Sequence, residues 1–396
     1  MKALLRFVIG TTMTFSLVGV TLGQHYSQTN LVSNTSGVAP VVDANLVNPW
    51  GLSRTSGGAW WVADNLTGVS TLYNGAGTKN PLIVTIPPAD PTNKSTPIGS
   101  PTGTISNSSP TDFLLTGGLA ANFLFCTIDG SIAGWNPNVA IAQGATAPST
   151  HAVTVVKTTD GSSYTGLTSA FVDGKPYLYA ANFTKGRVDV YDSVFRPVYL
   201  SGDRDDYHHR RNDEDGSFVD DRLPRNFVPF NVQTIGNNIV VTYALHQEGS
   251  PRETDGPGLG YVDIYSSKGD LLQRLEQGDW LNAPWGVALA PLDFGRFSHE
   301  LLIGQFAGAS TSESSGFIAA YDLATGRFDG LLQDANGNPI SINGIWAISP
   351  GNASPGNYDS SKSPVAQLYF SAVPNGGGLF GYLTAVSTDL TEGNDQ

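Results

Sequence analysis

The chain has 396 residues, of which only 14% are charged, and it contains 46 glycines, 24 prolines and a single cysteine. About 25% of the residues in a typical domain are charged, so this profile argues against a helical protein or a coiled coil. It favours many short strands joined by tight turns. The net charge of −13 repels phosphate backbones, so we expect no nucleic-acid partner.

Residues 1–23 have the features of a signal peptide. Lys2 and Arg6 precede an apolar stretch over residues 7–22, and small residues then lead to a cleavage site before Gln24. No other segment is long and apolar enough to span a bilayer. We therefore expect an exported protein, periplasmic or extracellular, with no membrane span after cleavage; an uncleaved N-terminal anchor is the alternative.

One pattern then recurs six times. Each copy has a turn with a short apolar strand, a strongly hydrophobic strand ending in small or amide residues, and a glycine followed by an alternating strand. The clearest copies begin at Asn48-Pro49-Trp50-Gly51-Leu52, Tyr164-Thr165-Gly166-Leu167 and Ala283-Pro284-Trp285-Gly286-Val287. The looser copies begin at Asp112-Phe113-Leu114-Leu115, Pro229-Phe230-Asn231-Val232 and Gly344-Ile345-Trp346-Ala347-Ile348.

This repeat predicts an all-β fold, a six-bladed β-propeller of four-stranded blades. The copies are roughly 55–63 residues apart, more than the ~40–50 of most propeller blades, so the connecting loops should be long. A four-stranded sheet cannot bury both faces alone, but sheets stacked around an axis can. We expect one propeller domain over residues 24–386 and a polar tail over 387–396; two β-sandwiches are the alternative.

Fourth strands are predicted between the copies, at residues 82–86, 152–156, 196–200, 271–275 and 328–332. The sixth copy has no such strand, whereas an orphan strand precedes the first copy at residues 26–32. Because closing the ring removes open sheet edges, we predict that this N-terminal strand is the outer strand of the last blade.

Three motifs carry a resemblance to a known family: Asn48 to Leu52, the run Ala181-Asn182-Phe183-Thr184-Lys185-Gly186-Arg187-Val188-Asp189-Val190-Tyr191-Asp192, and the run Leu281-Asn282-Ala283-Pro284-Trp285-Gly286-Val287-Ala288-Leu289-Ala290-Pro291. With them the chain resembles an uncharacterised family of exported bacterial β-propeller proteins, distantly similar to NHL-repeat propellers. The resemblance implies the fold, but it implies no activity and no functional residues. The chain departs from this family's pattern in a charged insertion at residues 201–220.

That insertion is one candidate site, for a metal ion or a partner, because carboxylates and histidines together can ligate Ca²⁺, Zn²⁺ or Mn²⁺. The candidate ligands are Asp205, His208, His209, Asp213 and Asp215. Asp213 and Asp215 supply only half of a calcium-loop pattern, since Arg211 stands where the first ligand would be. The alternative is a solvated insertion whose opposite charges neutralise one another.

A second candidate site is a ring of polar residues at the ends of the first and second strands, which we expect around one mouth of the channel. Its members are Asn48, Asp64, Asp129, Asn182, Asn231, Asn282, Gln305 and Asn343. Calcium-dependent lactonases and esterases with propeller folds use a comparable ring around the ion, with a general acid or base beside it. No glutamate and no convincing histidine accompany this ring, and the alternative is that these residues satisfy backbone groups in turns.

Trp50, Trp285 and Trp346 recur at equivalent positions, where we expect them to pack beside the inner strands. The alternative is that they stack on a sugar or an aromatic ligand. Cys126 lies in an apolar run and is expected to be a small buried hydrophobe.

Two functions follow. The favoured one is a monomeric, exported binding or scaffold module for a glycan, a polymer or a protein, with no defined catalytic set and no assured cofactor. The alternative is a calcium-dependent lactonase- or esterase-type hydrolase with its site at the channel mouth. The sequence leaves open whether the protein is an enzyme and leans against it, because it contains no G-x-S-x-G motif or phosphate-binding loop.

Overall fold

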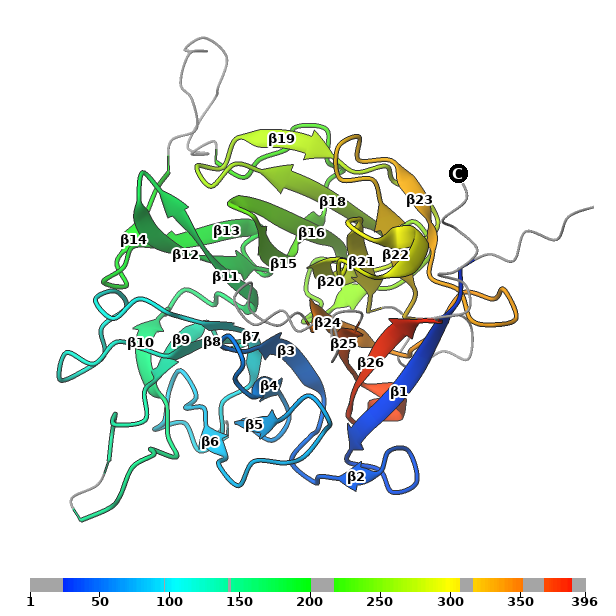
Figure 1. Cartoon of the computed structure of the whole chain (residues 1–396). Helices are drawn as coiled ribbons and strands as arrows, with labels where there is room; N and C mark the ends of the chain where they lie inside the picture. The colour runs from blue at the N-terminus through cyan, green and yellow to red at the C-terminus, as the bar shows by residue number, and fades with distance from the viewer. Residues whose placement is uncertain are drawn as a thin grey trace, which may run out of the picture.

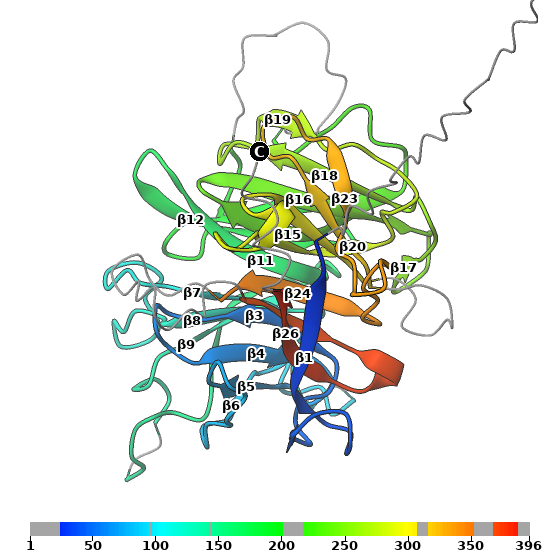
Figure 2. The same ribbon diagram turned by 45° about the vertical axis from the view of Figure 1, so that its right-hand side comes forward.

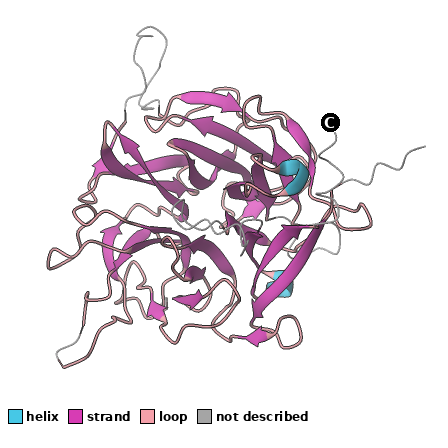
Figure 3. Ribbon diagram, viewed as in Figure 1, coloured by secondary structure: helices cyan, strands magenta, loops and turns pink. Residues whose placement is uncertain are grey.

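The computed structural model describes residues 24–95, 97–141, 144–200, 217–306, 316–351 and 367–386. Six antiparallel sheets are arranged around a central axis (Figure 1), and almost all of the regular structure is strand (Figure 3). Two short 3₁₀ helices, Gly295–Phe297 and Pro374–Gly376, complete the secondary structure of these ranges. No helix in this described part is both long and apolar enough to cross a membrane.

The six blades follow the chain, each beginning with its innermost strand. Blade I contains β3 (Pro49–Ser53), β4 (Trp60–Asp64), β5 (Val69–Tyr73) and β6 (Val84–Thr85). Blade II contains β7 (Pro101–Ser106), β8 (Phe123–Thr127), β9 (Ser131–Trp135) and β10 (Val153–Lys157). Blade III contains β11 (Tyr164–Val172), β12 (Lys175–Asn182), β13 (Arg187–Tyr191) and β14 (Pro197–Val198).

The remaining blades include two additions to the plan. Blade IV contains β15 (Phe227–Ile235), β16 (Asn238–His246), β18 (Gly260–Tyr265) and β19 (Leu271–Arg274), and β17 (Glu253–Thr254) also pairs with β16. Blade V contains β20 (Pro284–Leu289), β21 (Leu301–Gln305), β22 (Ile318–Tyr321) and β23 (Phe328–Leu331). Blade VI contains β24 (Ile345–Pro350), β25 (Gln367–Ala372), β26 (Leu379–Ala385), β1 (Tyr26–Ser33) and β2 (Val41–Val42).

The N-terminal strand closes the ring, as predicted. β1 pairs antiparallel with β26, from Tyr26 opposite Ala385 to Ser33 opposite Leu379. Figure 2 shows the two strands side by side although they come from opposite ends of the chain. β2 then adds a fifth, parallel strand outside β1, which the repeat did not predict. The six-bladed propeller is thereby confirmed, and the two-sandwich alternative is wrong.

The inner strand of blade II differs from the prediction. It is β7, and the predicted stretch 112–115 is a loop instead. In that loop Phe113 is 1% exposed, has a φ of 55°, and packs against Phe195. The misplacement has a physical reason: β7 is buried by its neighbours although it carries small and polar residues, whereas the apolar loop residues fill a gap between blades.

The recurring glycine of the inner strands marks the point where adjacent strands come closest. A Cβ atom at Gly103 would lie 2.3 Å from the backbone nitrogen of Leu167 in the next blade. A Cβ atom at Gly51 would lie 2.6 Å from the carbonyl oxygen of Thr102. A side chain at Gly51 or Gly103 would therefore collide with the next inner strand, so these two positions require glycine.

Candidate functional site in the central channel

Aromatic side chains close the channel at the end where the inner strands begin. We call this group the aromatic plug, and it consists of Trp50, Phe183, Phe230, Trp285, Phe306 and Trp346. Trp346 stacks on Trp50 with ring centroids 3.5 Å apart and on Phe306 at 3.9 Å. Trp285 meets both indoles edge-on, at 6.1 and 5.8 Å. Because no ring of the plug is more than 6% exposed, the plug seals this end of the channel.

Hydrogen bonds to other blades hold two of the indoles in place. The Trp285 N–H donates to the carbonyl oxygen of Thr165 at 2.9 Å, and the Trp346 N–H donates to Oδ1 of Asn48 at 3.0 Å. Within the described residues the buried Trp50 N–H has no acceptor. The three tryptophans therefore pack beside the inner strands, and of the three only Trp285 also lines the cavity next to the plug.

Beyond the plug the channel widens into a cavity of about 260 Å³. Its wall is formed by the parts of the inner strands that follow the plug residues, for example Leu52 after Trp50 and residues 347–350 after Trp346. The cavity therefore extends toward the carboxyl ends of the inner strands. Residues 352–366, which follow β24 at that end, lie outside the described part of the chain.

None of the described residues that line this cavity carries a charge. The aliphatic part of the lining includes Leu52, Leu167, Val287 and Ile348. The amides and hydroxyls of the lining belong to Thr104, Asn231, Gln233, Thr234 and Ser349. Such a lining offers hydrogen bonds and apolar contact but no opposite charge. The free-energy cost of removing a phosphate, a carboxylate or a metal cation from water would therefore not be offset there.

Two of these polar groups have no hydrogen-bond partner elsewhere in the described structure, namely the Gln233 amide and the Ser349 hydroxyl. The others are engaged: Asn231 donates from Nδ2 to the carbonyl oxygen of Trp285 at 2.7 Å, and Thr234 donates to that of Ser169 at 2.7 Å. Gln233 and Ser349 stand at the same level, each three residues after the plug residue of its own strand. Neither was singled out by the sequence, although an amide inside an apolar inner strand is a signal that could have been used.

The inner strands themselves add polar groups to the wall. Each of β3, β7, β11, β15, β20 and β24 is the terminal strand of its sheet, so one edge of its backbone is unpaired within the sheet. Such an edge presents N–H donors and carbonyl acceptors, which need partners when buried. In this propeller these edges face the axis, so that a ligand or water in the cavity can meet them.

Two long hairpins raise one side of the cavity mouth. The inner strands β11 and β15 have nine residues each, whereas β3 has five. The hydroxyls of Thr168 and Thr234 join the hairpins at 2.9 Å, and Asn237 bonds to the backbone of Phe171. On another blade Arg54 approaches the rim, with its guanidinium 3.5 Å from the carbonyl oxygen of Pro350; burial lowers the pKa of Arg54.

Members of the predicted polar ring make local hydrogen bonds, some within one blade and some to a neighbouring blade. Of the eight members only Asn231 lines the cavity. Asn48 accepts from Trp346 and donates to Asn65 at 3.2 Å. The backbone N–H of Asn282 donates to Oε1 of Gln305 at 2.9 Å. None of these contacts tests whether the ring binds a ligand, so its binding role stays a prediction.

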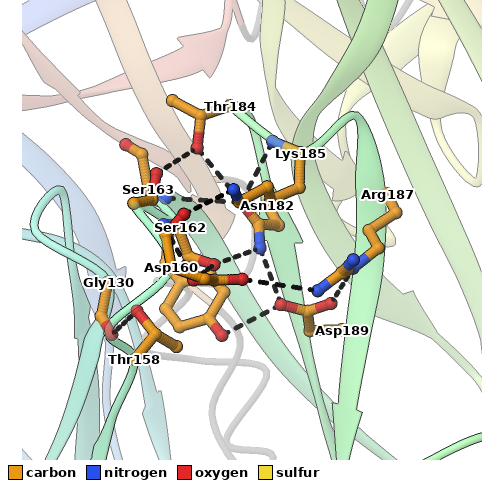
Figure 4. A network of polar contacts seen from close by, with 12 residues as sticks. Gly130, Thr158, Asp160, Ser162, Ser163, Asn182, Thr184, Lys185, Arg187 and Asp189 are labelled. Carbon is orange, nitrogen blue, oxygen red and sulfur yellow. Dashed lines mark hydrogen bonds and ion pairs between the residues drawn. The ribbon is translucent and has the colours of Figure 1, made fainter.

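Asn182 illustrates the local use of such a residue (Figure 4). Its Nδ2 donates to Ser162 at 2.9 Å and to Oδ2 of Asp189 at 2.7 Å, and Asp189 also accepts from Nε of Arg187 at 2.6 Å. The amide thus ties the end of β12 to β13 and to the loop that precedes β11. A half-exposed arginine already neutralises the carboxylate.

Two further ring members are carboxylates with different environments. Asp129 accepts from the backbone N–H of Ala89 at 2.7 Å and from the hydroxyl of Thr127. Asp64 is fully buried, and this burial raises its pKa well above the usual range despite a hydrogen bond from Thr71 at 2.7 Å. Within the described structure its Oδ1 has no hydrogen-bond partner, which favours the protonated form.

The candidate metal ligands of the insertion, Asp205, His208, His209, Asp213 and Asp215, lie outside the described residues. Inside them, no group of three or more histidine, cysteine, aspartate or glutamate side chains is arranged to hold a metal ion. Cys126 is fully buried, and burial raises the pKa of its thiol to about 12. The thiol therefore remains protonated and behaves as the buried hydrophobe that we expected.

No model of a known protein family matches the chain. The chain is similar to uncharacterised proteins of Acanthamoeba polyphaga mimivirus. One is 28% identical over 351 residues, which cover 86% of this chain and 80% of the relative. Another is 26% identical over 325 residues, which cover 81% and 72%. These relatives are viral, so they do not support the expected resemblance to a bacterial family.

Among solved structures, the chain is similar to the PQQ-bound aldose sugar dehydrogenase of Streptomyces coelicolor, with 13% identity, a TM-score of 0.46, and coverage of 91% of this chain and 98% of that one. It is also similar to virginiamycin B lyase of Staphylococcus aureus, with 10% identity, a TM-score of 0.42, and coverage of 92% and 100%. Likenesses of this extent say nothing about what this chain binds or catalyses.

Proposed function

We propose that the protein is an exported binding module that takes a sugar unit of a neutral glycan into the cavity of its central channel. The observation that carries this proposal is the uncharged lining, which combines aliphatic side chains with amides and hydroxyls. A sugar ring has the same mixed character, with apolar C–H faces and a rim of hydroxyl groups. Export rests on the signal-like residues 1–23.

The free polar groups of the cavity give this proposal its binding residues. The Gln233 amide can donate one hydrogen bond and accept another, and so can the Ser349 hydroxyl. Sugar hydroxyls, which are both donors and acceptors, match groups of this kind. Leu167 and Val287 supply apolar surface beside them. Ligand sites commonly combine mostly apolar walls with a few placed polar groups.

A calcium-dependent hydrolase in this channel has less support. Its metal would need carboxylate ligands and its chemistry a general acid or base, whereas the described lining of the cavity contains no aspartate, glutamate or histidine.

The test is a neutral-glycan array followed by calorimetric titration of the best ligand. We expect the double variant Gln233→Ala/Ser349→Ala to bind ~10–100-fold more weakly, since each lost hydrogen bond is worth about 1 kcal/mol. The matched control is Gln28→Ala/Ser27→Ala, which alters the same residue types on exposed positions of β1. Equal affinity of the two double variants, or an array without any bound neutral glycan, would refute the proposal.

A further inference from the structure

We infer that the channel recognises the end of a glycan chain and not its interior. This inference rests on the proposed function, and it follows from the channel being closed at one end. A polymer bound along its length needs a groove or a channel open at both ends. Here the aromatic plug fills the axis between the starts of the inner strands, with Trp50, Trp346 and Phe306 stacked in succession.

The plug is part of the core and not a gate. Its residues come from blades I, III, IV, V and VI, and each is buried by the others. The Trp285 and Trp346 N–H groups also donate hydrogen bonds to residues of other blades. To thread a chain through, several buried rings would have to leave the core together, which a small sugar contact cannot offset. Any ligand must therefore enter and leave through the same mouth.

The size of the cavity limits how much of the chain can enter. Its volume of about 260 Å³ lies just below the ~300–1,000 Å³ of pockets that enclose drug-sized ligands. One sugar unit, with part of a second, fits that space, and the rest of the glycan has to remain outside. A unit in the middle of a chain would require both of its neighbours to leave through the same opening.

The mouth also disfavours a chain that lies across it. β11 begins level with β3 and is four residues longer, whereas β15 continues two residues farther beyond Phe230 than β3 does beyond Trp50. At ~3.3 Å per residue the two hairpins therefore rise on the order of 13 Å and 7 Å beside the opening. Thr168 and Thr234 brace this wall. A terminal unit that enters along the axis reaches Gln233 and Ser349 without meeting the wall, whereas an internal segment would have to bend over it.

The experiment compares glycans whose ends are free or blocked. Maltohexaose, cellohexaose, mannohexaose and N-acetylchitohexaose are titrated into the wild-type protein in three forms each: unmodified, reduced to the alditol at the reducing end, and capped with a 4,6-O-benzylidene group at the other end. The first three sugars probe gluco- and manno-configurations, and the fourth probes an acetamido group.

For the hexasaccharide that binds, we expect one of the two modifications to weaken binding by at least thirtyfold and the other to change it less than threefold. Ser349→Phe, which places a ring in the cavity, should abolish binding, and its melting temperature shows whether it is folded. If neither end modification changes the affinity, chain-end recognition is refuted while glycan binding stands. If none of the four unmodified sugars and no neutral glycan of the array binds, the proposed function falls, and this inference falls with it.

Discussion

Replacing Asp263 by asparagine should abolish a loss of stability that the wild-type protein suffers as the pH rises. Asp263 lies on β18, is 2% exposed, and accepts a hydrogen bond from the Tyr265 hydroxyl at 3.2 Å. Burial and the nearby carboxylate of Asp220 raise its pKa to about 7. Burial raises the pKa of Asp220, but its ion pair with Arg274 and the hydrogen bond from the backbone N–H of Arg222 together outweigh burial and lower that pKa, so Asp220 stays ionised. Tyr243 completes the surroundings through its bond to Tyr265.

The sign and the size follow from proton linkage. Asp263 has a pKa of about 7 in the folded protein against 3.8 when unperturbed, so between these values the folded state holds a proton that the unfolded state has released. Its stabilising contribution is complete below pH 3.8 and is lost as the pH rises through 7. At ~1.4 kcal/mol per pH unit, and with the carboxyl half ionised at pH 7, the loss from pH 5 to pH 7 is about 2 kcal/mol; it levels off near ~3 kcal/mol above pH 7.

Asparagine keeps the shape of the protonated carboxyl and can donate to Asp220, but it does not titrate. Urea unfolding of wild-type protein and Asp263→Asn at several values between pH 5 and pH 8.5 measures the difference. We expect the two to be similar at pH 5, and the variant to gain about 3 kcal/mol relative to wild type by pH 8.5. Parallel stability curves across that range would show that Asp263 is already ionised in the folded protein at pH 5, and would refute this reasoning.

Three further changes test the fold. Trp346→Ala should lower the free energy of unfolding by ~3–5 kcal/mol, because this plug residue is 1% exposed and stacks on two rings; a loss below 1 kcal/mol by urea titration would contradict the sealed end. Gly103→Ala should destabilise by ~1–3 kcal/mol, since its Cβ would lie 2.3 Å from the nitrogen of Leu167, and an unchanged melting temperature would show that the strands can separate. Val32→Asp, which puts a carboxylate on a fully buried position of β1 opposite Phe380, should expose residues 26–33 to amide hydrogen exchange. Retained protection there would mean that closure does not depend on this contact.

Most of the fold could be predicted because it is repeated. Gly68 and Gly186 directly precede the third strands of their blades and have a positive φ. Such a glycine forms the turn between the second and third strands and thereby fixes the register in which they pair. Six approximate copies of such local signals identify a propeller even where single copies are weak. Closure by β1 was predictable for a different reason, since an unpaired strand and a blade lacking its outer strand complement each other.

β7 escaped prediction because its burial is decided by its neighbours. Thr102 is fully buried although it is polar, since its hydroxyl donates to the carbonyl oxygen of Tyr164 at 2.7 Å in the next blade. Leu114 in the nearby loop is apolar but 42% exposed. Hydrophobicity alone therefore predicts the inner strand at residues 112–115 and not at β7. The hydrogen bond that buries Thr102 of β7 joins residues from different blades, and the local sequence gives no sign of it.

The candidate site was harder to predict, because the same positions serve packing in one part of the channel and binding in another. The sequence drew attention to strand ends, where Asn48 and Asn182 stand, and there the structure uses amides to join strands and to orient an indole. The tryptophans at the start of the inner strands pack there as expected, and because they seal that end, the accessible part of the channel lies toward the opposite end. Gln233 becomes conspicuous only then, because it is a free amide in a cavity whose far end is blocked.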